Sequence, residues 1–189
     1  MNNPKEIASE IIALYNNYGN ADYIGEPVSQ IEHMSQSAQL AIDGGFDDEL
    51  ILAAFFHDIG HICIQTITYE TMGDFGVKSH EQIGADFLRS RGFSERIARL
   101  VENHVNAKRY LTFKLPEYFN SLSEASKRTL EYQGGRMSEH EAEEFENNPL
   151  FEHSLLLRRW DEQAKEMNVP VINLKIIENK IEMALQQSS

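Results

Sequence analysis

Two histidines and an aspartate follow one of the most apolar stretches of the chain, which reads LILAAFFHDIGHI at Leu50–Ile62. Burying the Asp58 carboxylate beside the His57 imidazole costs several kcal/mol unless a partner satisfies it. A metal ion would satisfy both groups, because imidazole nitrogens and carboxylate oxygens bind Zn, Mn and Fe. The His57–Asp58 doublet, with His61 one helical turn later, is therefore the first candidate for chemistry.

Three further histidines interrupt segments that otherwise carry apolar residues at helical spacing: His33, His80 and His104. Each one alone is more typical of a hydrogen-bonded core histidine than of a metal ligand. Together with the doublet, and with Asp161 in RRWDEQAK, they favour a metal site. The single cysteine, Cys63, excludes a site built from paired thiolates.

Two cations lie at helical spacing from these candidates. Lys108 is four residues after His104, and Arg158 is three residues before Asp161, so each can point where the ligand points. The ordinary alternatives are a solvated surface position for Lys108 and a salt bridge to Asp161 for Arg158. Four imidazoles and two carboxylates carry only two negative charges, so a pair of metal ions at this site would attract an anion.

Two more polar groups of residues accompany the candidate ligands. Ser126, Thr129 and Gln133 recur at helical spacing and form a neutral polar stripe. Such a stripe is usually just the solvent-exposed face of a helix. Tyr23 and Glu26 lie in DYIGEP, a short loop whose glycine gives the backbone freedom. On their own, Tyr23 would be a hydrophobic staple at the start of the next helix and Glu26 would be an acidic surface residue.

The elements that must position these residues are helical throughout. Apolar residues recur with helical period, and serine, aspartate and proline mark the helix starts. The pattern predicts a single all-α domain over residues 1–189, with the metal-binding core at about residues 20–167. The expected helices begin at Pro4, Pro27, Asp47 or Asp48, Ser79, Ser94, Ser123, Ser138, Pro149 and Asn173.

Composition limits the partners. The net charge of −13 argues against nucleic acid or an anionic membrane as the main partner, because both need a basic surface. No apolar stretch approaches the ~20 residues that span a bilayer. The N-terminal stretch lacks the basic start and apolar centre of a secretory signal, and one cysteine suits a reducing compartment. We therefore expect a cytoplasmic protein.

The order His33, His57–Asp58, Asp161 resembles the HD-domain metalloproteins. The resemblance implies a helical HD-domain bundle. His80 and His104 lie between the doublet and the final aspartate, as in the members of this family that bind two metal ions. The resemblance implies that Asp58 bridges to a second metal ion, which His80 and His104 hold.

Five motifs, DYIGE, HDIGH, HVNAKRYL, TLEYQGG and RRWDEQAK, resemble a smaller group, the mixed-valent diiron oxygenases of phosphonate breakdown. The likeness extends from Tyr23 to Asp161. It implies two irons in the Fe(II)/Fe(III) state, dioxygen as co-substrate, and cleavage of the C–P bond of (2-amino-1-hydroxyethyl)phosphonate to glycine and phosphate. It also implies a separate hydroxylase that supplies this small organophosphonate.

The resemblance assigns roles to the remaining residues, and it implies that the catalytic ones are Tyr23, Glu26, His61 and Lys108. Tyr23 would cap one iron until substrate arrives, and Glu26 would face the substrate ammonium. His61 would support the metal site or contact the substrate. The residues implied to hold the phosphonate are Lys108, Ser126, Thr129, Gln133 and Arg158; those implied to hold metal are His33, His57, Asp58, His80, His104 and Asp161.

Three alternatives remain open at this point. The same chemistry on the trimethylamino analogue would use an aromatic cage, for which Tyr23, Tyr69 and Phe75 are available. A metal-dependent HD phosphohydrolase would use a metal-activated hydroxide at the same doublet and no oxygen. A non-catalytic HD module would usually have lost a ligand or gained an effector domain, and neither is evident here.

Overall fold

The computed structural model describes residues 3–23, 25–66 and 69–187, and the all-α prediction is confirmed. In these ranges no strand is formed, and β-pairing is limited to two isolated bridges. The elements are α1 (Pro4–Tyr18), α2 (Gln30–Asp43), α3 (Asp48–Phe56), η1 (Ile59–His61), η2 (Cys63–Thr66), α4 (His80–Ser90), α5 (Glu95–Lys114), α6 (Pro116–Ser121), α7 (Glu124–Tyr132), α8 (Glu139–Glu146), α9 (Phe151–Gln163) and α10 (Leu174–Gln187).

Two proline-based helix starts are wrong, because local hydrogen bonds place the start elsewhere. The helix expected from Pro27 begins at Gln30, where Ser29 and Glu32 form a capping box. The helix expected from Pro149 begins at Phe151, because the Asn148 side chain accepts a hydrogen bond from the Leu150 N–H (2.8 Å) and holds a turn.

Two further local details differ from expectation. Ser79 precedes α4 in the left-handed region, at φ 57°, and its side chain makes no capping hydrogen bond. The short helix α6 was not expected at all. Its N-terminal proline, Pro116, is a helix-start signal.

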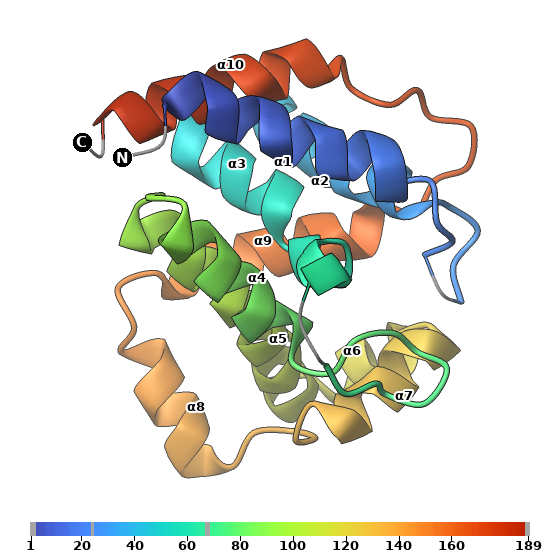
Figure 1. Cartoon of the computed structure of the whole chain (residues 1–189). Helices are drawn as coiled ribbons and strands as arrows, with labels where there is room; N and C mark the ends of the chain where they lie inside the picture. The colour runs from blue at the N-terminus through green and yellow to red at the C-terminus, as the bar shows by residue number, and fades with distance from the viewer. Residues whose placement is uncertain (1–2, 24, 67–68, 188–189) are drawn as a thin grey trace.

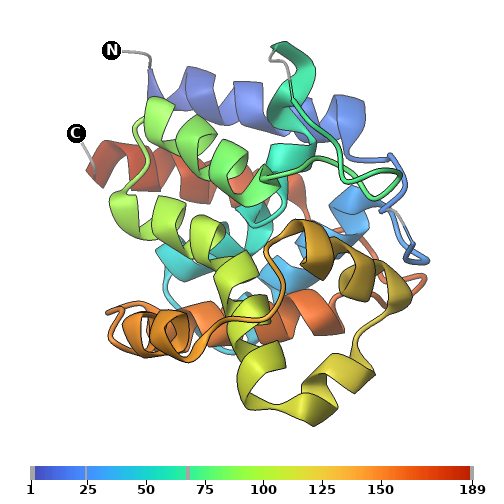
Figure 2. The same cartoon turned by 90° about the horizontal axis from the view of Figure 1, so that it is seen from below.

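The helices surround one main hydrophobic core. Helix α10 runs beside α1, and α2 packs on α3 (Figures 1 and 2). Helices α4, α5 and α9 close the other side of that core, while α8 packs on α5 and α9 in a smaller cluster around Phe145. Within the described ranges no helix is long and apolar enough to cross a membrane.

Helix α3 carries the His57–Asp58 doublet into the interior. Every residue from Leu50 to Phe56 is buried, so burial of apolar surface on all sides fixes this helix. Its last carbonyls are satisfied from the side: the Tyr15 hydroxyl donates to the Phe55 carbonyl (3.1 Å). The chain then turns at His57, which is fully buried, so the doublet cannot lie on the surface.

Candidate metal centre

His33 and His57 meet ring to ring with their Nε2 atoms 2.9 Å apart. Each ring's Nδ1 lies 2.8 Å from a backbone carbonyl, that of Ala164 for His33 and that of Ala54 for His57. A neutral imidazole has one N–H, and the carbonyls claim it at Nδ1. Two Nε2 lone pairs then face each other, which is favourable only with a cation, a proton or a metal ion, between them.

His80 and His104 form a second pair with the same arrangement. Their Nε2 atoms are 3.1 Å apart, and their Nδ1 atoms face the carbonyls of Val77 (3.3 Å) and Val101 (2.6 Å). Backbone carbonyls on the second nitrogen are the usual way in which proteins orient metal-binding histidines. The chain therefore holds two histidine pairs that each present free nitrogens.

The Asp58 carboxylate lies between the two pairs and turns one oxygen toward each. Its Oδ2 is 3.4 Å from His57 Nε2 and 3.6 Å from His33 Nε2. Its Oδ1 is 3.2 Å from His80 Nε2 and 3.4 Å from His104 Nε2. A carboxylate placed in this way has the geometry to bridge two cations.

Asp161 completes the first cluster. Its Oδ1 is buried and makes no hydrogen bond in the part of the chain that the structure describes, although His33 Nε2 lies 3.3 Å away. Burial opposes its ionisation, but the Arg158 guanidinium holds the pKa of Asp161 well below its usual range. An ionised, unsatisfied buried oxygen beside two imidazole nitrogens fits a transition-metal ion such as iron.

Charge inside the cluster is balanced by protons when no metal is bound. Burial disfavours a charged His57, yet the Asp58 carboxylate raises the pKa of His57 to about 9. The nearby imidazoles hold the pKa of Asp58 well below its usual range despite its burial. A metal ion would replace the proton on His57, because metal-binding histidines coordinate in their neutral form.

His61 has a different character from the four paired histidines. Its ring stacks on His80 (centroids 4.2 Å apart), and its Nδ1 accepts the Val77 N–H (3.3 Å). Burial and the His80 imidazole lower the pKa of His61 to about 3, so it is neutral. Because Nδ1 accepts, Nε2 carries the hydrogen and is a donor, which favours a contact role over metal binding although His61 lies near Asp58 and His80.

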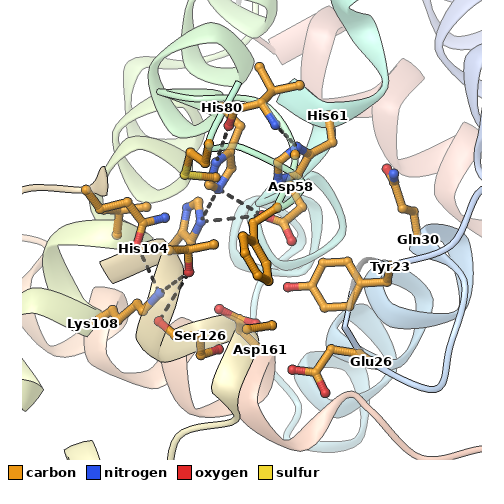
Figure 3. Close-up of a pocket in the computed structure, with 18 of the residues that line it drawn as sticks. Tyr23, Glu26, Gln30, Asp58, His61, His80, His104, Lys108, Ser126 and Asp161 are labelled. Atoms are coloured by element: carbon orange, nitrogen blue, oxygen red, sulfur yellow. Dashed lines mark hydrogen bonds and ion pairs between the residues drawn. The ribbon is translucent and has the colours of Figure 1, made fainter. Parts of the chain in front are cut away.

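A cavity of about 370 Å³ opens beside the cluster (Figure 3). His33 and His57 are fully buried and do not line it. The structure brings all the other candidate site residues together on its walls: Tyr23, Glu26, Asp58, His61, His80, His104, Lys108, Ser126, Thr129, Gln133, Arg158 and Asp161.

Lys108 is a buried cation on the cavity wall, so the surface alternative is wrong. Its Nζ donates to Thr129 Oγ1 (2.7 Å) and to Gln133 Oε1 (3.0 Å). Burial and the neighbouring Arg158 charge hold the pKa of Lys108 well below its usual value. No carboxylate pairs with it in the described ranges, so its charge is available to an anion.

Arg158 makes the salt bridge that was its ordinary alternative. Its guanidinium pairs with Asp161 and with Glu162, and its Nε donates to the Tyr118 hydroxyl (2.8 Å). It also lines the cavity, so it can contact a ligand there while it orients Asp161. The two roles are compatible, because a guanidinium has five N–H donors.

Tyr23 closes the metal side of the cavity. Its ring stacks on His33 (centroids 4.1 Å apart), and its hydroxyl points toward Asp58 and Asp161 (Figure 3). Burial and the Asp58 charge raise the pKa of Tyr23 well above its usual value, so the hydroxyl keeps its proton.

Glu26 is already paired. Its Oε1 accepts from Ser123 Oγ (2.7 Å) and from Lys165 Nζ (2.8 Å), and the side chains of Glu26 and Lys165 are only 10% and 15% exposed. Oε2 makes none of these contacts. Glu26 can therefore offer one carboxylate oxygen to a ligand.

Sequence reasoning missed two residues of this site. Lys165 belongs to the quoted RRWDEQAK motif, but it follows the end of α9, so helical spacing gives it no direction. Gln30 lines the cavity with a buried Oε1 that has no partner among the described residues, and nothing in its sequence context singled it out.

Gly60 is the close contact that brings the doublet to α4. A Cβ there would overlap the His80 carbonyl oxygen and stand 2.7 Å from the carbonyl carbon. We expect Gly60→Ala to lower the free energy of unfolding by about 3 kcal/mol and to reduce metal binding, because η1 and α4 must separate. Denaturant unfolding measures this.

Gly45→Ala is the matched control, since a Cβ there meets open space and only the backbone, at φ 71°, is strained. It should cost about 1 kcal/mol. Equal losses in the two variants would contradict the packing explanation for Gly60.

The chain is similar in sequence to known proteins. Residues 31–143 match the HD domain family. An uncharacterised protein of Acanthamoeba polyphaga mimivirus is 44% identical over 100% of this chain and 87% of its own length. The 1-hydroxy-2-(trimethylamino)ethylphosphonate dioxygenase (glycine-betaine-forming) of Leisingera caerulea is 40% identical over 88% of this chain and 84% of its own length. Hydroxymethylphosphonate dioxygenase of Gimesia maris is 37% identical over 98% of this chain and 91% of its own length. The chain therefore belongs to the HD-domain family.

Proposed function

We propose that the chain is a dioxygenase that cleaves the C–P bond of (2-amino-1-hydroxyethyl)phosphonate to glycine and phosphate at two irons. The observation that carries this proposal is Asp58, which turns one oxygen toward each histidine pair beside a cavity that holds the cations Lys108 and Arg158. A metal pair next to an anion site suits a phosphonate. The names of two relatives, both phosphonate dioxygenases, support the reaction class.

The proposed iron ligands divide into two sets that share Asp58. In the mixed-valent Fe(II)/Fe(III) state the pair carries five positive charges, against two from the carboxylates, so about three remain for an anion and oxygen ligands. When bound, the irons would supply dioxygen activation and a charged anchor for the substrate oxygens. The ligand sets are His33, His57, Asp58 and Asp161 for one iron, and Asp58, His80 and His104 for the other.

The proposed reaction balances with one dioxygen molecule. The C–H and C–P bonds at the hydroxyl-bearing carbon break, and that carbon is oxidised to the glycine carboxylate. One oxygen atom enters the carboxylate and the other enters phosphate. Dioxygen is the only oxidant needed, and a separate hydroxylase would supply the 1-hydroxy substrate.

The protein's own residues bind and orient the substrate in this proposal. The Lys108 ammonium and the Arg158 guanidinium would hold phosphonate oxygens, with Ser126, Thr129 and Gln133 around them. The His61 Nε2–H would donate to a substrate oxygen. Tyr23 would cover the metal side of the cavity until substrate displaces it, because its hydroxyl points there in the free chain (Figure 3).

Two kinds of group could recognise the amine end of the substrate: a carboxylate or an aromatic cage. Glu26 Oε2 is a hydrogen-bond acceptor for a primary ammonium. An aromatic cage for a trimethylamino group would need the ring faces of Tyr23, Tyr69 and Phe75. One face of Tyr23 is covered by His33, and Tyr69 is 44% exposed, so the cavity favours the primary amine.

Glu26→Gln tests this assignment. We expect kcat/KM for (2-amino-1-hydroxyethyl)phosphonate to fall about tenfold, because a charged hydrogen bond is replaced by a neutral one. Hydroxymethylphosphonate has no amine and serves as the control substrate, with a change of less than about twofold expected. Equal losses on both substrates would show that Glu26 does not read the amine.

An oxygen-electrode assay tests the function itself. The iron-loaded protein is given one of three phosphonates, (2-amino-1-hydroxyethyl)phosphonate, its trimethylamino analogue or hydroxymethylphosphonate, or in a separate run a phosphate ester. Oxygen, glycine and phosphate are followed. Oxygen uptake with glycine and phosphate from the first substrate is the expected result. Oxygen uptake with only one of the other two phosphonates would support the same reaction class but assign a different substrate. Phosphate release from a phosphate ester without oxygen uptake would contradict the oxygenase and indicate a phosphohydrolase.

A further inference from the structure

A second pocket, here called the outer pocket, adjoins the candidate site and has a volume of about 550 Å³. Phe75 lines both cavities. Helix α7 contributes to both as well: Ser126 and Thr129 line the candidate site, whereas Lys127 and Arg128 line the outer pocket. The two cavities thus share Phe75 and helix α7 as parts of their walls.

The outer pocket carries two arginines without carboxylate partners in the described ranges, Arg128 and Arg136. Both are exposed. The Arg128 guanidinium lies 5.6 Å from the Phe75 ring centroid, and that of Arg136 lies 4.6 Å from the Phe119 centroid. Stacking on an aromatic ring holds a guanidinium in place while its N–H edges stay free for an anion.

The charge balance of the outer pocket differs from that of the whole chain. Its lining holds three cations, Lys127, Arg128 and Arg136, and two carboxylates, Glu124 and Glu131, which leaves +1. Lys127 and Glu124 pair with each other (3.1 Å). The chain as a whole has a net charge of −13, so it repels a dianion in solution. The arginines therefore form a local positive region next to the cavity that needs the anion.

We propose that the outer pocket is an anion-capture site: Arg128 and Arg136 bind the phosphonate dianion on its way to the candidate site past Phe75. This inference rests on the proposed function for the identity of the anion. It adds a site whose residues neither bind metal nor contact the reacting carbon. Local positive charge at a cavity mouth raises the association rate, and salt weakens that effect.

The test compares the double variant Arg128→Gln/Arg136→Gln with the control Lys5→Gln/Arg99→Gln. The control also removes two positive charges, but its residues line neither cavity. Steady-state oxygen uptake is measured at salt concentrations from about 20 mM to about 300 mM. In the arginine variant kcat/KM should fall about tenfold at low salt and depend less on salt, with kcat within about twofold. The control should match the wild type.

Other outcomes would overturn the capture site. Equal losses in the two double variants would indicate a general effect of net charge. An unchanged kcat/KM in the arginine variant would exclude capture. A change only in the inhibition constant of inorganic phosphate would assign the pocket to the outgoing product instead of the incoming phosphonate.

A binding measurement separates this inference from the proposed function. If the wild type turns over no phosphonate, the proposed function fails, and calorimetric titration with methylphosphonate at low salt then tests the pocket directly. The Lys108→Met variant removes the main cation of the candidate site from this titration. Binding that persists in Lys108→Met and is lost when Arg128→Gln/Arg136→Gln is added supports the capture site; no binding to the wild type overturns it.

Discussion

Asp58→Asn is expected to abolish oxygen consumption, by at least about 10³-fold in kcat, and to lower the metal content to about one ion per chain or less. Asparagine keeps the size of the side chain but has a single oxygen and no charge, so it cannot serve both histidine pairs. The buried imidazoles of His33, His57, His80 and His104 would also lose the anion that they share. Metal analysis and an oxygen electrode measure the two effects.

Asp43→Asn is the matched control. Asp43 lies at the exposed end of α2, where it accepts a hydrogen bond from Gln39 (2.7 Å). This variant should keep full metal content and activity. Circular dichroism of both variants separates loss of the site from loss of the fold. Full metal content and activity in Asp58→Asn would contradict a bridging role.

Lys108→Met is expected to lower kcat/KM by about 10²- to 10³-fold, chiefly through a higher KM. The change removes a buried ammonium that no carboxylate neutralises in the described ranges and that faces the proposed phosphonate. Methionine is similar in length and fills the same space, so folding should survive. Lys114→Met, on the same helix but paired with Glu146 (2.8 Å), is the control and should change kcat/KM by less than about twofold. A similar KM in the two variants would show that Lys108 does not bind the substrate.

Because Lys108 is buried, we also expect kcat/KM to depend on pH. A lysine binds an anion while it is protonated, which is below its pKa, and burial moves the pKa of Lys108 down from its ordinary value. As pH rises through this lowered pKa, kcat/KM should fall at a pH where an ordinary lysine is still charged. In Lys108→Arg the guanidinium stays charged, so this alkaline fall should disappear from the profile. A fall that persists in Lys108→Arg would belong to another group.

The helices could be predicted from local patterns because caps and apolar periodicity are local properties. Ser94 and Ser138 cap α5 and α8 as expected. The helix start expected at Pro27 was wrong, because proline only permits a helix start. The capping box between Ser29 and Glu32 fixes the start at Gln30.

The cavity lining could be anticipated only in part. Residue type and spacing selected His80, His104 and Lys108, which the fold brings to one cavity. The ion pair between Glu26 and Lys165 joins residues 139 positions apart, so no local pattern encodes it. The tight packing at Gly60 depends on the placement of α4 and is likewise invisible in the sequence.

In the proposed function, Asp58 joins two irons held by two histidine pairs. Metal analysis of the purified protein, produced with ample iron and normalised to protein concentration, tests it most directly. We expect about two irons per chain, one for each pair. A single metal ion per chain at saturation, or a preference for a redox-inert metal over iron, would contradict it.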